Sequence, residues 1–133
     1  MRLRIRILAV LVAASLLASA KTETLPELIA REEAAKVEDR PALCTEIAER
    51  QLKAADELYT AGKVEEAQAA VKDVVTYSEK AHDAAIQSGK KLKNTEIDFR
   101  KMAAKLRDIK RSLNFEDQTP VQEAADQIGR AHV

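Results

Sequence analysis

The hydrophobic positions after residue 24 recur at steps of three and four, the spacing that places them on one face of an α-helix. The clearest pattern lies in residues 91–113, whose apolar stripe consists of Phe99, Met102, Ala103, Leu106, Ile109 and Leu113. Residues 41–61 and 64–88 carry similar stripes that are rich in Ala and Val. Nowhere do apolar and polar residues alternate as they do in a half-buried strand, so the pattern predicts an all-α fold.

Start and stop signals divide this pattern into separate helices. Thr24 is a suitable N-cap for the first helix, and Gly62 and Gly89 are suitable stop residues. Thr119 and Pro120 favour the start of a short last helix. The five predicted helices cover residues 25–38, 41–61, 64–88, 91–113 and 120–131. Short breaks between long helices predict a small antiparallel up-down bundle of four to five helices, with the middle three at its centre.

The first twenty residues form a separate segment. Three arginines within the first six residues precede an apolar run over 7–17, and Ala18-Ser19-Ala20 follows. This three-part form is typical of a secretory signal peptide, so we expect residues 1–20 to be removed by cleavage after Ala20. A retained membrane anchor is the alternative, although the run is short against the roughly 20 residues of a spanning helix. Residues 21–133 are then expected to form a single periplasmic or secreted domain.

Composition narrows the range of functions. The 133 residues are 46% hydrophobic and 33% charged but only 3% aromatic, with 3 Gly, 3 Pro and 1 Cys. So few aromatic side chains do not favour a stacking surface for nucleic acid. The chain contains no nucleophile elbow and no Gly-rich phosphate loop, and we therefore expect a protein that is not an enzyme and holds no cofactor.

The formal net charge of zero hides a strong segregation along the chain. Residues 21–89 contain 9 basic and 15 acidic residues, whereas residues 90–113 contain 9 basic and 3 acidic residues. The basic residues of the fourth predicted helix lie mostly opposite its apolar stripe. The candidate contacts to an anionic surface are Lys93, Arg100, Lys101, Lys105, Arg107 and Arg111. This basic amphipathic helix, over 91–113, is either a solvated face that complements acidic helices or a surface that binds an anionic membrane, envelope component or acidic partner.

One pair of residues could carry chemistry. A hairpin turn centred near Gly62 would place Cys44 opposite His82, and Gln51 opposite Val74 or Val75. A histidine beside a thiol can lower the pKa of that thiol, and the two side chains could also supply two metal ligands. The alternative is structural, because free cysteine is often buried as a small hydrophobic residue. No second cysteine completes a zinc site.

The segment from Tyr59 to Ala67, with its Gly62 turn, resembles the turn of a tetratricopeptide (TPR) repeat. In that family an aromatic residue precedes a glycine turn, and two acidic residues and a small alanine begin the second helix. Ala67 would be the small residue of the second helix, with Val71 and Val74 as the next packing positions. The resemblance covers about residues 45–78 of a hairpin over 41–88. It implies one helical hairpin within a bundle and a role in protein–protein interaction.

Taken together, the sequence predicts an exported, non-catalytic interaction or scaffold protein that binds another envelope or secreted protein. One alternative is binding of an anionic surface or a small ligand through the helix over 91–113. A second alternative is a thiol- or metal-dependent activity at Cys44 and His82. Self-association is also compatible with the sequence, and binding to nucleic acid is not expected.

Overall fold

The structure is a computed structural model, and it describes residues 22–130. The predicted signal peptide, residues 1–20, lies outside the described residues. The described chain is an all-α bundle without β-strands, as the periodicity predicts. Its helices are α2 (Leu25–Ala34), α3 (Arg40–Thr60), α4 (Val64–Ser88), α5 (Leu92–Arg111), the 3-10 turn η1 (Phe115–Asp117) and α6 (Gln118–Arg130).

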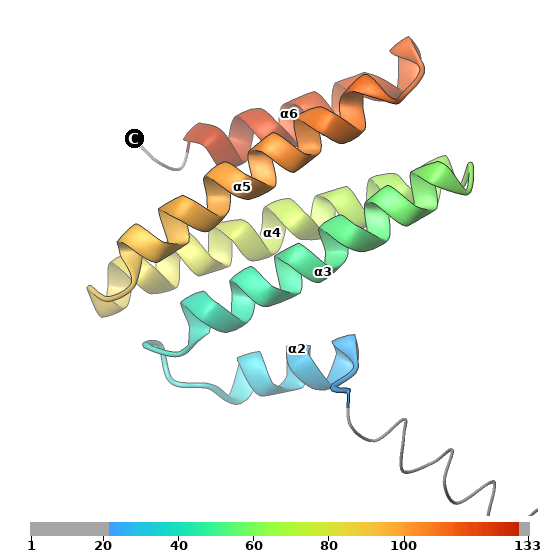
Figure 1. Ribbon diagram of the computed structural model, residues 1–133. Helices are drawn as coiled ribbons and strands as arrows, with labels where there is room; N and C mark the ends of the chain where they lie inside the picture. The colour runs from blue at the N-terminus through green and yellow to red at the C-terminus, as the bar shows by residue number, and fades with distance from the viewer. Residues whose placement is uncertain (1–21, 131–133) are drawn as a thin grey trace, which may run out of the picture.

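Two antiparallel hairpins and one short helix make up the bundle. The α3–α4 pair forms the most extensive interface, and α5 pairs with α6. Figure 1 shows α2 lying against α3 on the side away from α5 and α6. The α6 helix also packs on α4 more extensively than α5 packs on either α3 or α4, so the short last helix is more central than the sequence predicts. One end of the bundle carries the α2–α3 and α4–α5 connections, and the other end carries the α3–α4 and α5–α6 connections (Figure 1).

The tight α3–α4 turn depends on Gly62. Its φ of 77° lies in the left-handed region, which a residue without a Cβ adopts at little cost. The backbone N–H of Gly62 donates to the carbonyl of Tyr59, and that of Lys63 donates to the carbonyl of Leu58. These two bonds form a Schellman motif, which satisfies carbonyls at the end of α3 and reverses the chain. The predicted stop at Gly62 is therefore confirmed, as is the one at Gly89, where φ is 67°.

Small residues fill the α3–α4 interface, and larger ones join it to the second hairpin. The fully buried alanines of α3 and α4 are Ala48, Ala55, Ala67, Ala81 and Ala85. The large buried side chains of α5 and α6 are Phe99, Met102, Leu106, Ile109, Val121 and Ile128. The side chains on which the TPR resemblance rests, Tyr59, Ala67, Val71 and Val74, are all buried in this core.

The first helix is shorter than its predicted range of 25–38. The Thr24 hydroxyl caps it as predicted, accepting from the Glu27 N–H at 3.3 Å. The helix ends at Ala34 because Ala35 is extended, with a ψ of 155°, and the Arg40 Nε–H donates to its carbonyl at 3.2 Å. This early end lets the chain turn back and place α2 on α3.

The last helix begins earlier than predicted. It starts at Gln118, directly after η1, so Thr119 and Pro120 lie inside its first turn instead of at the N-cap and first position. A proline is tolerated there because the first four N–H groups of a helix have no partner within the helix. The Gln118 side chain donates to the Leu113 carbonyl at 3.1 Å and ties this start to the end of α5.

The packing of α5 predicts a clear contrast between two substitutions. We expect Leu106→Ala, which removes a fully buried side chain, to lower the free energy of unfolding by about 2–5 kcal/mol. Ile97→Ala, on the exposed face of the same helix, is expected to change it by about 0.5 kcal/mol or less. Urea unfolding followed by circular dichroism measures both. Equal losses would show that the apolar stripe of α5 is not its packing face.

Candidate functional site

Cys44 lies in the interior of the bundle, at the contact between α2 and α3. Its side chain is fully buried, and its Sγ donates a hydrogen bond to Oε1 of Glu32 at 3.3 Å. Burial raises the pKa of the thiol from its ordinary 9.0 to about 12, and the hydrogen bond and negative charge of Glu32 act in the same direction. Nearby Lys80 and Arg40 oppose this only in part.

This environment leaves Cys44 as a neutral thiol at physiological pH. The thiolate is the form that attacks electrophiles and binds metals, and it is the form that this site disfavours. Within residues 22–130, no group of three or more His, Cys, Asp and Glu side chains is arranged to hold a metal ion. The geometry at Cys44 therefore supports helix packing better than it supports chemistry.

His82 lies against α5. Its ring centroid is 6.4 Å from that of Phe99, and its Nδ1 is 3.9 Å from Oδ1 of Asp83. Of the contacts described for Cys44 and His82, none joins the two side chains. The Cys44 thiol is bonded to α2, the His82 ring contacts α5, and Cys44 belongs to the same buried core as Phe99.

One hydrogen bond joins the middle of α3 to the middle of α4. The Gln51 Nε2 donates to Oδ2 of Asp73 at 3.0 Å, so Gln51 contacts the residue that precedes the predicted Val74. Farther from the turn, Lys80 of α4 is close enough to lower the pKa of the Cys44 thiol in part.

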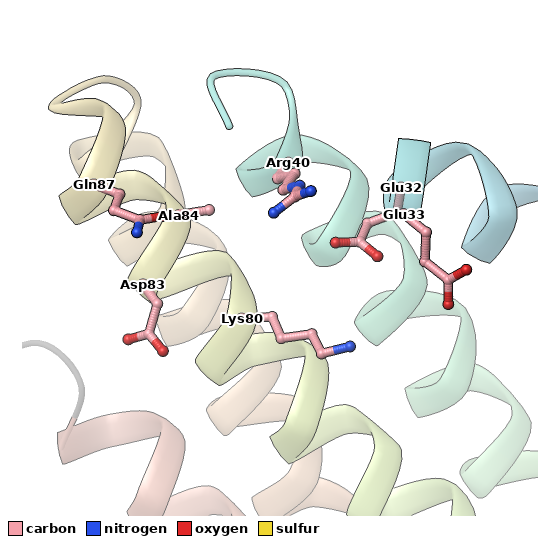
Figure 2. A pocket seen from close by; sticks show the side chains of 7 residues that line it. All are labelled: Glu32, Glu33, Arg40, Lys80, Asp83, Ala84 and Gln87. Atoms are coloured by element: carbon pink, nitrogen blue, oxygen red, sulfur yellow. The ribbon is translucent and has the colours of Figure 1, made fainter. Parts of the chain in front are cut away.

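A polar crevice of about 340 Å³ opens beside the Cys44–Glu32 contact (Figure 2). Figure 2 shows Lys80 of α4 extending toward the side where α2 carries Glu32 and Glu33, with Arg40 of α3 between the two helices. The Lys80 ammonium also lies 4.8 Å from the ring centroid of Tyr77. The crevice is lined by Glu32, Glu33, Arg40, Lys80, Asp83, Ala84 and Gln87. Because both acidic and basic side chains line the crevice, it favours neither an anionic nor a cationic ligand.

Glu32 is the residue of this region that sequence reasoning missed. It is only 5% exposed, which is unusual for a carboxylate. The available signal is its position, since it follows Leu25 by seven residues and Leu28 by four and therefore continues their stripe. Its role in the structure is to hold α2 on α3, together with the ion pair between Arg31 and Glu46.

The outer face of α5 presents most of its basic residues to solvent, as predicted. Lys105 is an exception, because its Nζ lies 3.1 Å from Oδ2 of Asp56 and links α5 to α3. Arg111 pairs with Asp108 on its own helix at 2.8 Å. The other predicted contacts have no ion pair within the described residues, and all are exposed: Lys93, Arg100, Lys101 and Arg107.

Lys101 has a weaker electrostatic partner on the neighbouring helix. Burial, followed by the charge of Asp98, raises the pKa of Glu49 on α3, and Lys101 lowers it. Lys101 thus compensates part of the acidic surface of α3. Among the exposed cations of α5, Lys93, Arg100 and Arg107 are the ones for which no ion pair or influence on a carboxylate is seen.

Exposed apolar side chains gather near these cations. In the described chain, three of the four large hydrophobic residues that are exposed fall within residues 86–97, namely Ile86, Leu92 and Ile97. The fourth, Phe115, lies in η1 at the opposite end of the bundle. We use the name α4–α5 patch for the exposed residues Ile86, Lys90, Leu92, Lys93, Ile97 and Arg100.

The packing of α5 changes the meaning of its amphipathic pattern. An interfacial membrane helix inserts its apolar face among lipids, but Phe99 and Leu106 of α5 are fully buried in the bundle. The helices within residues 22–130 are also too short or too polar to cross a membrane. In the folded protein, the part of α5 that is exposed to a partner is its basic face, with the few apolar side chains on it.

Comparison with known protein families, with curated proteins and with solved structures finds no match for this chain.

The environment of Cys44 predicts slow reaction with a thiol reagent. With a pKa of about 12 against an ordinary 9.0, the thiolate fraction at pH 8 is about a thousandfold smaller than in the unfolded chain. We expect the reaction with an aromatic disulfide reagent to be at least about 100-fold slower than in urea, and Leu28→Ala to accelerate it by loosening α2. Exposed Ile97→Ala is the control that should leave the rate unchanged.

The same pKa sets the sign of a pH effect on stability. The unfolded thiol loses its proton near pH 9, whereas the folded thiol keeps it up to about pH 12. The protonated Cys44 thiol therefore contributes its full stabilisation to the folded state below pH 9, and this contribution is lost as pH rises toward 12. Cys44→Ala should remove this part of the alkaline dependence in urea titrations. For the thiol reagent of the preceding prediction, a reaction of Cys44 that is as fast in the native protein as in urea would contradict a buried, protonated thiol.

Proposed function

We propose that this protein is a non-catalytic binding module that recognises an acidic, amphipathic segment of another exported protein through the α4–α5 patch. The observation that carries the proposal is the position of Ile97, which is 40% exposed on the outer face of α5. Lys93 precedes it by one helical turn, and Arg100 and Lys101 follow it by one turn.

A purely solvated face does not require an isoleucine among cations. Residues three and four apart are neighbours on a helix, so Ile97 is enclosed by positive charges on both sides. A partner that covers Ile97 with an apolar side chain would bring its flanking carboxylates next to Lys93 and Arg100. Exposed Leu92 and Ile86 extend the apolar surface toward the α4–α5 turn.

The chemistry of the patch favours a protein over the other anionic partners. Nucleic acid recognition relies on aromatic stacking or dense phosphate contacts, and the large apolar residues of the patch are aliphatic. A lipid bilayer would need a larger exposed apolar surface for insertion than α5 provides, because its stripe is buried. An acidic protein segment with spaced apolar residues complements both components of the patch.

Two sequence features support this assignment. The resemblance of Tyr59–Ala67 to a TPR turn suggests a hairpin of a kind used in protein–protein interaction. The basic, apolar and small-residue order of residues 1–20 supports export, which would place the partner in the periplasm or among secreted proteins. The neutral, buried thiol of Cys44 supports a non-catalytic role.

Export can be tested directly by mass spectrometry of the protein. We expect the mature chain to begin at Lys21, because cleavage follows the small residues of Ala18-Ser19-Ala20. Replacing both alanines of this site with aspartate should block processing and leave the precursor associated with membranes. Detection of the intact N-terminus on wild-type protein in the soluble fraction would contradict export by this route.

The binding proposal predicts loss of affinity for an acidic amphipathic probe. The probe is a labelled helical peptide with leucines on one face and glutamates elsewhere. Its binding to the protein is measured by fluorescence anisotropy. We expect the triple variant K90Q/K93Q/R100Q to bind about tenfold more weakly, since three surface ion pairs of about 0.5 kcal/mol each amount to that factor. We expect Ile97→Ser to weaken binding about fivefold through lost apolar burial.

Matched controls separate the patch from general charge and hydrophobicity. The variant K36Q/K53Q/K72Q removes three exposed lysines elsewhere, and Phe115→Ser removes the most exposed large apolar side chain. Both should bind the probe as the wild type does. Equal losses in control and patch variants would overturn the proposal. Binding of polyglutamate or anionic vesicles that is insensitive to Ile97→Ser would indicate a charge-only surface, and concentration-dependent dimers abolished by the triple variant would identify a second copy as the partner.

A further inference from the structure

A second positively charged surface lies at the other end of α5. There the last turns of α5 meet the first turns of α6 around an open crevice of about 440 Å³. The crevice, which we call the α5–α6 crevice, is lined by Arg107, Lys110, Arg111, Gln118 and Gln122. Figure 1 shows that this end of the bundle is opposite the α4–α5 connection, so the crevice is separate from the α4–α5 patch.

The charge of the crevice is incompletely compensated. Arg107 has no ion pair within the described residues, and Arg111 pairs with Asp108 at 2.8 Å. The Lys110 ammonium donates to the neutral amide oxygen of Gln122 at 2.7 Å. The Oδ1 of Asp126 on α6 accepts from the Gln122 Nε2 at 2.8 Å. Three cations thus line the crevice, and no carboxylate is among its lining residues.

Contacts across the seam between α5 and α6 hold Lys110 in place. The chain of hydrogen bonds from Lys110 through Gln122 to Asp126 fixes the ammonium between the two helices. Arg107 reaches across to α6, where its guanidinium lies 3.8 Å from the point that a Cβ on Gly129 would occupy. Because the Lys110 ammonium is already positioned, an anion that binds it would lose less affinity to the ordering of that side chain.

We propose that the α5–α6 crevice binds a phosphate-type oxyanion, either free or carried by a larger molecule such as an anionic lipid headgroup. A tetrahedral anion has enough oxygens to accept from the guanidinium fork of Arg107 and from the Lys110 ammonium at the same time. A single planar carboxylate is satisfied by one guanidinium. The volume of the crevice exceeds that of the anion and leaves space for the group that carries it.

The test is a titration of the purified, isotope-labelled protein with inorganic phosphate, followed by NMR at constant ionic strength with chloride as the reference anion. We expect saturable shifts confined to the backbone of residues 107–111 and to the side-chain amides of Gln118 and Gln122. The variant R107Q/K110Q should bind phosphate about tenfold or more weakly, because charge-assisted hydrogen bonds are lost. Arg107→Lys, which keeps the charge but loses the fork, should give a smaller loss.

The matched control is K93Q/R100Q, which removes two charges from the same helix outside the crevice and should change phosphate affinity by about twofold or less. Vesicles of phosphatidylglycerol, compared with phosphatidylcholine, identify the source of the anion if R107Q/K110Q also weakens binding to them. Shifts spread along α5, or equal losses in the two double variants, would overturn the proposal. Binding of the acidic helical peptide by R107Q/K110Q should remain intact, so failure of the crevice and failure of the α4–α5 patch are distinguishable.

Discussion

The close packing of α3 against α4 is the constraint on which the other helices depend. Alanines occupy much of this interface, and small side chains let two helix backbones approach closely over more than five turns. The resulting slab has two faces. One receives the large apolar residues of α5 and α6, and the other receives the single short helix α2.

This arrangement determines which surface of α5 remains outside. The apolar stripe that includes Phe99, Leu106 and Ile109 is buried against the other helices. The basic side chains and Ile97 on the opposite face of α5 are therefore the ones that remain exposed. The same constraint positions the end of α5 beside the start of α6 and brings Arg107 and Lys110 next to two glutamines. In isolation, the amphipathic pattern of α5 suggests a helix that lies on a lipid surface. In the bundle, the same basic residues contribute to two separate surfaces, the α4–α5 patch and the α5–α6 crevice.

Local sequence signals predicted the elements well, whereas features that depend on tertiary contacts were out of reach. Gly62 and Gly89 end their helices as expected because a left-handed residue is a local requirement. The early end of α2 depends on a bond from Arg40 to Ala35, and the early start of α6 depends on the preceding 3-10 turn. The hydrogen bond from Cys44 to Glu32 depends on how α2 folds back on α3, which the pattern of a single hairpin does not contain. The ion pair of Lys105 with Asp56 likewise depends on how α5 is placed across α3.

The order of the helices also bears on how quickly the chain reaches its native state. α2 packs on α3, α3 on α4 and α5 on α6, so most interfaces join neighbours in sequence, and α4 with α6 is the main longer-range contact. Such local topology is associated with folding in microseconds to milliseconds. For a chain with a single cysteine, folding also has a chemical benefit. In the folded chain Cys44 is enclosed between α2 and α3, so its thiol is withheld from linkage to a second chain for as long as α2 stays in place.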